Sequence, residues 1–316
     1  MKLKKPRTPF LGSSFAASPR GSDAALFGAP HGTPYRGIDN RPCETAPDAL
    51  RRALAPDKGF LDSWDFDFGG PLLGRSGQYR FADLGDLPTR AKQAAKNRKL
   101  IEDCTRDILH HGAIPLMIGG DDSTPIPFIK AFSGSPPITI LQIDAHIDWR
   151  RERYGEPLGF SSTMRRASEM GHVGKIVQVG LRGMGSAREQ EVRDAEAWGA
   201  RLITAADIHL RGLGLALDHI DKDAPLLITL DCDAIDWSIM PAVTYPTTGG
   251  LTYTQVTRLI QAAIAKARLV GFDLIEFVAR RDQGGIGAFT AARIICNVIG
   301  SLAKTIPLPP AGSAIA

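Results

Sequence analysis

Short apolar runs of β type alternate with longer helical patterns over most of the chain. Six apolar runs predict strands: residues 24–30, 114–120, 138–144, 176–181, 226–233 and 269–277. Apolar residues that recur every three to four positions predict helices over residues 89–111, 187–199, 254–267 and 290–303. This alternation favours a mainly parallel central sheet with helices on both faces. The sequence therefore predicts an α/β fold of three layers, helix on sheet on helix, in a single domain.

The two ends of the chain differ in composition from the part between them. Residues 1–22 are basic and rich in Pro, Ser and Gly, which predicts a flexible or surface-draped arm instead of a folded unit. Residues 307–316 are interpreted as a tail of the same kind. Residues 23–306 contain neither a linker nor an internal repeat, so we expect them to form the α/β domain.

Composition and charge narrow the class of protein. Of the 316 residues, 43% are hydrophobic and 23% charged, which is far from the composition of disordered chains. The 38 Lys and Arg against 34 Asp and Glu leave a net charge of +4, too small to suggest a nucleic-acid binder. No stretch reaches the roughly 20 uninterrupted apolar residues that a membrane crossing needs, and the basic N-terminus lacks an apolar signal-peptide core.

Four cysteines, at positions 43, 104, 232 and 296, are widely scattered and form no Cys-x-x-Cys pair. This spacing argues against a zinc finger, a redox dithiol or a disulfide framework. Such cysteine usage fits a reducing compartment. We therefore expect a cytoplasmic protein with neither a membrane nor a nucleic acid as its partner.

Aspartates follow three of the apolar runs at the point where each run ends. The segments are GGDDS at 119–123, QIDAHID at 142–148 and TLDCDAID at 229–236. Each segment alone has a second interpretation as a turn or a helix cap. In open parallel sheets, however, the carboxyl ends of the strands meet at one edge. Because so many like charges at one edge repel one another unless a cation neutralises them, the three segments together predict bound metal.

The spacing of these residues indicates which side chains share an ion. Asp144, His146 and Asp148 stand at alternate positions, as do Asp231 and Asp233, so in an extended chain each set points to one side. Carboxylates with one imidazole suit Mn²⁺ and related first-row divalent ions. Two such ions can be bridged by the same carboxylates.

These segments resemble the motifs of the ureohydrolase family, the agmatinase and arginase group of dinuclear metal enzymes that hydrolyse guanidino compounds and release urea. The resemblance covers nearly the whole chain after residue 22. It includes FGAPHGTPYRGIDNRPCETAPDALR at 27–51, DLGD at 83–86, the three acidic segments, TGGL at 248–251 and GFDLIEF at 271–277. It implies an arginase-like fold and a centre of two divalent metal ions.

The resemblance also implies a role for each ligand. Asp144 and Asp231 would bridge the two ions. Asp148 would complete the site of one ion, and His146 and Asp233 would complete that of the other.

Asp122 occupies the position of the remaining family ligand, which is a histidine. One interpretation keeps Asp122 as a ligand. The other makes it a helix cap and leaves this metal position weak or empty. A carboxylate there would shift the preference towards harder ions, so we expect Mn²⁺, with Ni²⁺ as the alternative.

Bulkier residues replace family residues around the expected site. A family histidine after the second motif aligns with Phe160, next to Ser161. The family's Gly-Thr-Gly-Thr loop becomes Ala-Val-Thr-Tyr, which ends in Thr244 and Tyr245. These side chains would contact the substrate and narrow the mouth, which favours a substrate smaller or more alkylated than agmatine.

Three further residues receive roles in the expected reaction. Glu276 resembles the family residue that binds the guanidinium, the alternative being a surface carboxylate at a strand end. Asp148 would bind metal and relay a proton to the departing amine. His31, in the loop after the first predicted strand, is a candidate for lining the mouth of the substrate site.

The resulting hypothesis is a metal-dependent, agmatinase-like amidinohydrolase that cleaves a C–N bond of a small guanidino compound. The losses at positions 122 and 160 motivate a second hypothesis, a non-catalytic or regulatory subunit in a hetero-oligomer with a homologous chain. A third keeps the hydrolase but changes its substrate to another amidine, a biguanide or a formimidoyl compound. The resemblance also implies a homo-oligomer, a trimer or a hexamer.

Overall fold

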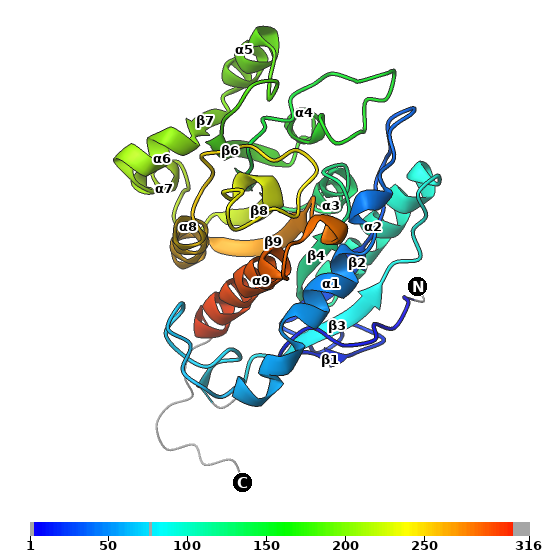
Figure 1. The fold of residues 1–316 in the computed structure, drawn as a ribbon, viewed down its shortest axis with the longest axis vertical. Coiled ribbons are helices and arrows are strands. Elements are labelled where there is room, and N and C mark those ends of the chain that lie inside the picture. The colour runs from blue at the N-terminus through cyan, green and yellow to red at the C-terminus, as the bar shows by residue number, and fades with distance from the viewer. Residues whose placement is uncertain (1–2, 76–77, 306–316) are drawn as a thin grey trace.

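The computed structural model describes residues 3–75 and 78–305, and its centre is one sheet of nine parallel strands (Figure 1). The strand order is β1-β3-β2-β4-β9-β8-β5-β6-β7. The strands are β1 Ser14–Phe15, β2 Ala24–Ala29, β3 Phe81–Asp86, β4 Ile114–Gly119, β5 Ile138–Ile143, β6 Val173–Leu181, β7 Arg201–Thr204, β8 Pro225–Asp231 and β9 Arg268–Ile275. The order places β4, β9, β8 and β5 side by side in the middle of the sheet.

Helices cover both faces of this sheet, and an apolar core fills each interface. One core contains residues of α1, α6, α7, α8 and α9, and the other contains residues of α2, α3, α4 and α5. The bounds are α1 Ala46–Ala53, α2 Ala94–His110, α3 Pro125–Lys130, α4 Thr163–Ser168, α5 Glu189–Trp198, α6 Ala205–Arg211, α7 Gly214–Leu217, α8 Tyr253–Lys266 and α9 Ile286–Thr305. Short 3-10 helices are η1 Arg41–Cys43, η2 Ala55–Phe60, η4 Cys232–Ala234 and η5 Ala279–Arg281. The predicted three-layer α/β fold is confirmed.

The six predicted strands and four predicted helices are all present, with shifted ends. The helix expected from residue 89 begins at Ala94, because residues before it form turns in which the Asn97 side chain bonds both Arg90 N and Arg90 O. The apolar pattern missed β1, β3 and β7. These strands are short or, in β3, interrupted by the DLGD acids, so they carry little apolar signal.

The N-terminal segment lies against the edge of the sheet. Its residues Ser14 and Phe15 form β1, which pairs with β3, and Phe10 is only 1% exposed. The Phe10 N–H also donates to the Asp83 carboxylate at 2.9 Å. The segment expected as an arm thus contributes a strand and a core side chain. The expected tail, residues 307–316, lies outside the described residues.

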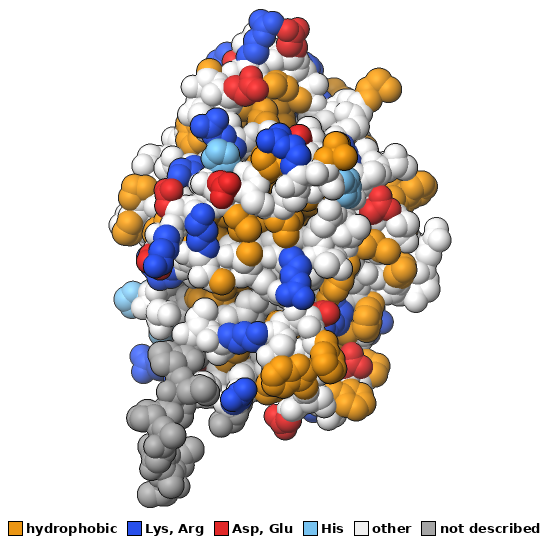
Figure 2. Space-filling view, turned by 90° about the vertical axis from the view of Figure 1, so that its left-hand side faces the viewer, with side chains coloured by type: hydrophobic (Ala, Val, Ile, Leu, Met, Phe, Trp, Pro, Cys, Tyr) orange, Lys and Arg blue, Asp and Glu red, His pale blue; other side chains and the backbone are white. Residues whose placement is uncertain are grey.

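Helix α9 is long and apolar enough to cross a membrane by length and composition alone. In this fold it is a core helix, because 83% of its most apolar window is buried. It packs against α1 and α8. On the face shown in Figure 2, the basic side chains of the described residues are scattered among acidic and apolar ones instead of forming one stripe.

A buried network of ion pairs connects helix α1 to strand β3. Arg51 is 1% exposed, and its guanidinium bonds Asp83 at 2.8 and 2.9 Å and Asp86 at 2.5 Å. Burial disfavours the Arg51 cation, but the charges of Asp83 and Asp86 outweigh burial and raise its pKa. Asp83 is itself fully buried, so removing Arg51 would leave a buried carboxylate without its ion-pair partner.

We expect Arg51→Met to lower the free energy of unfolding by about 3–5 kcal/mol, because it leaves a buried carboxylate unpaired. Arg52→Met is the matched control, since Arg52 is an exposed neighbour that pairs with Asp48 at the surface. The control should cost about 0–1 kcal/mol. Urea unfolding of the two variants measures both values. Equal losses would contradict a structural role for the buried pair.

Candidate metal centre and active site

Four neighbouring strands bring the acidic residues to one edge of the sheet. Asp144 follows β5 directly, Asp231 is the last residue of β8, and Glu276 follows β9. The strand registers pair Leu230 with Ile143 and Asp231 with Ile275, so these carboxyl ends lie level with one another. The edge predicted from the sequence to collect the acids is therefore the edge at which they meet.

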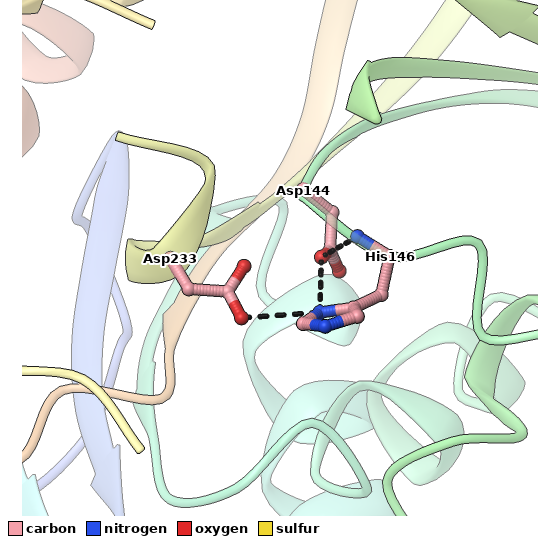
Figure 3. A group of neighbouring side chains, drawn as sticks. All are labelled: Asp144, His146 and Asp233. Atoms are coloured by element: carbon pink, nitrogen blue, oxygen red, sulfur yellow. Dashed lines mark hydrogen bonds and ion pairs between the residues drawn. The ribbon is translucent and has the colours of Figure 1, made fainter. Parts of the chain in front are cut away.

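One group of ligand atoms is formed by Asp144, His146 and Asp233 (Figure 3). His146 Nδ1 lies 3.1 Å from Asp233 Oδ2 and 3.4 Å from Asp144 Oδ1. Burial lowers the pKa of His146, but the hydrogen bonds and charges of these two carboxylates outweigh burial and raise it to about 12. In this arrangement a proton on the imidazole takes the place that a metal ion can occupy between the same three residues.

A second group contains Asp122, Asp144 and Asp148, whose ligand atoms lie within 4.8 Å of one another. Both carboxylate oxygens of Asp122 are buried and accept no hydrogen bond from the described residues. The helix-cap interpretation of Asp122 does not fit, because Thr124 occupies the N-cap position of α3 and the Asp121 carboxylate accepts the Ser123 N–H. Unpartnered buried oxygens beside two further carboxylates fit a hard divalent cation.

The ionisation of the acids reflects their crowding. Burial, together with the charges of neighbouring acids, raises the pKa of Asp122, Asp144 and Asp231 well above the ordinary range. Burial also raises the pKa of Asp148. For Asp233 burial opposes ionisation, but the His146 hydrogen bond and charge outweigh it and lower the pKa. Without cations the cluster therefore holds protons, and divalent cations would take their place.

Two site residues have left-handed backbone conformations, which side chains other than glycine rarely adopt. The φ angle is 46° at Asp148 and 61° at Glu276. Such conformations cost of order 1–3 kcal/mol each and cluster at functional sites. Both side chains line the same cavity, so the strained backbone places two carboxylates there.

Glu276 lies beside the acidic cluster instead of on the surface, contrary to its alternative interpretation. Its side chain is 9% exposed, and Oε1 accepts the Asp122 N–H at 3.0 Å. Burial, with the charge of Asp121 next in effect, raises the pKa of Glu276 to about 8. A cationic substrate would restore the charged form of this carboxylate.

A cavity of about 430 Å³ opens above the acids. Its lining includes the predicted substrate contacts Phe160, Ser161, Thr244, Tyr245 and Glu276, together with Asp122, His146, Asp148, Asp231 and Asp233. Asp144 is 1% exposed and lies beneath this surface. The sequence predicted each of these positions.

His31 lies apart from the cavity. Its ring nitrogens contact Thr89 Oγ1 at 3.1 Å and Glu44 Oε2 at 3.2 Å, in a separate surface hollow. His31 therefore does not line the cavity above the acids, contrary to the expectation from the sequence.

A model of the arginase family matches residues 22–300 of this chain. The chain belongs to the arginase family. The ureohydrolase identified from the sequence motifs is thereby confirmed, and the chain is related to hydrolases of guanidino and amidino compounds.

Two named relatives and one solved structure align with most of this chain. Mitochondrial guanidino acid hydrolase of Homo sapiens is 27% identical over 300 residues, which are 91% of this chain and 80% of that protein. N(1)-aminopropylagmatine ureohydrolase of Thermus thermophilus is 33% identical over 218 residues, 68% of this chain and 71% of that protein. The solved structure of proclavaminate amidino hydrolase from Streptomyces clavuligerus covers 96% of this chain and 99% of its own, with a TM-score of 0.82 at 24% identity. At this identity the similarity to the solved structure shows a shared fold and nothing more.

Sequence reasoning missed the polar residues that support the arginase-family ligands from within the sheet. Gln142 Nε2 donates to Asp144 Oδ2 at 2.7 Å and to Asp148 Oδ2 at 2.9 Å. Gln178 in turn donates to Gln142 Oε1 and to the Ile147 carbonyl. The signal was present in the sequence, because a glutamine inside an otherwise apolar central strand needs a polar partner.

We expect Gln142→Leu to weaken metal binding by about 10- to 100-fold, because hydrogen bonds to ligating carboxylates orient them. Thr139→Val is the control, a buried position on the same strand without contact to a ligand. Competition for Mn²⁺ against a chelator measures both affinities. The same affinity in the two variants would show that Gln142 does not position the carboxylates.

We expect the metal-free protein to lose stability as pH rises from 6 to 8. A folded-state pKa above the unfolded value gives stability that is lost as pH rises through the folded pKa, as for Glu276 from 4.5 to about 8. Asp122, Asp144 and Asp231 shift in the same direction. The pKa of Asp233 is lowered instead, so the contribution of Asp233 to stability changes with pH only below its ordinary pKa of 3.8.

Bound Mn²⁺ should reduce this pH dependence, because it takes the place of the protons. The melting temperature of the metal-free and Mn²⁺-loaded forms at the two pH values measures the effect. Parallel pH profiles for the two forms would contradict it.

Proposed function

We propose that the protein is a metal-dependent hydrolase that cleaves a C–N bond of a small guanidino compound and releases urea. The observation that carries this proposal is the pair of unpartnered, buried Asp122 oxygens beside further carboxylates on a cavity floor. Buried acids in such numbers are destabilising unless cations neutralise them. The relatedness to guanidino and amidino hydrolases supports the same reaction class.

The residues that would hold two divalent ions are those expected from the sequence. Five belong to the two groups of ligand atoms, Asp122, Asp144, His146, Asp148 and Asp233. The sixth, Asp231, is in neither group but lines the same cavity. Mn²⁺ fits this set best, and Ni²⁺ is the alternative, because five carboxylates and one imidazole are mainly hard oxygen donors. When bound, such ions supply an acidified water that can act as a nucleophile near neutral pH.

The chain's own groups would bind and orient the substrate. The Glu276 carboxylate is the anion available to a guanidinium, and its hydrogen bond from the Asp122 N–H fixes its position over the floor. Asp148 lines the cavity and would relay a proton to the departing amine. Gln142 holds Asp148 in place through its 2.9 Å hydrogen bond. Phe160 and Tyr245 narrow the mouth and exclude water.

Two alternative functions differ from this proposal, one in its metal content and the other in its product. A non-catalytic subunit would retain the fold without bound metal, and the free Asp122 oxygens argue for the metal-binding form. A hydrolase of another amidine, a biguanide or a formimidoyl compound would use the same floor but give a different product. The homo-oligomer and the cytoplasmic location remain predictions from the sequence.

We expect the purified protein to bind close to two Mn²⁺ or Ni²⁺ ions per chain and to release urea from a small guanidino compound. Asp231→Ala should abolish urea release and lower metal content. Cys232→Ala is the control, because Cys232 is buried in the apolar core between two ligands and should leave metal content unchanged. Metal analysis by mass spectrometry and a urea assay give the two readouts.

Unchanged turnover in a folded Asp231→Ala variant would refute the site. A folded wild-type chain without stoichiometric metal would favour the non-catalytic alternative. Ammonia or an amine in place of urea as the product would identify the other substrate class.

A further inference from the structure

Arg153 lies on the loop between β5 and α4 and lines the same cavity as the acids. Its guanidinium carbon is 5.5 Å from the ring centre of Tyr35, 5.1 Å from that of Tyr154 and 5.9 Å from that of Phe160. Aromatic contacts of this kind hold a guanidinium by its charge and leave its N–H groups available as donors. Arg153 is therefore a half-buried cation held at the cavity by three rings.

This cation has no anionic partner within residues 3–75 and 78–305. No carboxylate of those residues lies within 4.0 Å of it, and its guanidinium donates no hydrogen bond to them. Nearby arginines differ, since Arg150 contacts Glu191 at 3.8 Å and Arg165 contacts Glu169 at 2.9 Å. Five free donors on a positioned cation at a cavity wall form a site for an anion.

The charges that line the cavity fall into two groups. The acids are all at most 9% exposed and form the floor: Asp122, Asp148, Asp231, Asp233 and Glu276. The half-buried arginines in the lining are Arg150 and Arg153, and the half-buried His146 belongs with the proposed metal ligands of the floor instead of with these cations. The other half-buried and exposed lining residues, such as Ser161 and Tyr245, are uncharged. A substrate whose guanidinium meets the floor thus places its other end among cations.

We propose that the substrate carries a carboxylate at the end opposite its guanidinium, and that Arg153 selects it by binding this carboxylate. The proposal rests on the proposed function, because it assumes that the guanidinium binds at the floor. The substrate class is then a short ω-guanidino acid. A substrate with an amine tail would place its ammonium group near the Arg153 guanidinium at the mouth, where the two positive charges repel each other.

The neighbouring aromatic residues fix where Arg153 sits. The ring centres of Tyr35 and Phe160 are 4.7 Å apart, and the Tyr35 hydroxyl accepts the Ser161 N–H at 2.9 Å. A side chain at Gly159 would come within 2.1 Å of the Tyr35 ring, so glycine is needed there. Phe160, which stands where the resemblance expects a histidine, is thus part of the platform under Arg153.

The test compares three guanidines that differ only in tail charge. These are 4-guanidinobutyrate, butylguanidine and agmatine, assayed for urea with the Mn²⁺-loaded full-length chain. We expect kcat/KM to be highest for the carboxylate. Arg153→Gln should lower it by about 10- to 100-fold for the carboxylate, mainly through KM, and leave the neutral guanidine within about 3-fold.

Two further variants distinguish the effect of the positive charge of Arg153 from the effect of its planar guanidinium. Arg153→Lys keeps the charge without the planar donor fork and should retain part of the carboxylate preference. Arg151→Gln removes an exposed, adjacent arginine that does not line the cavity, and it should behave as wild type. Calorimetric binding of the three compounds to the metal-free and the Mn²⁺-loaded protein reads the same preference without turnover.

The outcomes distinguish this inference from the proposed function. Urea release with equal or better use of the neutral or amine tail would overturn the carboxylate preference and leave the hydrolase intact. A carboxylate preference unchanged by Arg153→Gln would overturn the role of Arg153. Without urea from any compound the proposed function fails, and binding then decides: tighter binding of the carboxylate, lost in Arg153→Gln, supports the anion site, and equal binding overturns it.

Discussion

Repulsion among buried carboxylates at the carboxyl edge of a parallel sheet is the constraint on which the site depends. Aspartates follow the ends of β4 and β5 and form the end of β8, and the strand order β4-β9-β8-β5 brings them together at one edge of the sheet. Burial, together with the charges of neighbouring acids, raises the pKa of Asp122, Asp144 and Asp231, so these groups retain protons when no cation is bound. Divalent cations relieve the repulsion, so a hydrolase built on this edge would derive its chemistry and part of its stability from the same ions.

Polar groups beneath the acids hold them in place. Gln142 bridges Asp144 and Asp148 from within β5, and Gln178 on β6 supports Gln142 in turn. These glutamines are buried within the sheet, where an unsatisfied amide would be costly. The arrangement resembles the outer-shell hydrogen bonds by which proteins orient metal ligands before the ion arrives. A separate buried network, in which Arg51 of α1 binds Asp83 and Asp86 of β3, joins helix to sheet elsewhere in the fold.

The wall of the cavity carries the features in which this chain departs from its family pattern. Phe160 and Tyr245 stand where the resemblance expects smaller or polar residues, and they contact each other across the mouth at 6.4 Å between ring centres. With Tyr35 they form an apolar rim against which Arg153 rests. The same residues that would narrow the entrance therefore also position a cation there. In the proposed hydrolase the floor would determine the reaction type and the rim the choice of substrate.

The sequence by itself determined the three-layer fold, the central strands and the acids at their ends, because apolar runs and strand-end aspartates are local patterns. The apolar pattern missed the short strands β1 and β7, and also β3, in which the DLGD acids interrupt the apolar run. Only the tertiary structure decided that the Asp122 oxygens lack partners among the described residues, that His31 faces another hollow, and that Arg153 meets the distant Tyr35 as well as rings of its own loop. Such contacts depend on how loops far apart in sequence pack together, which no local pattern records.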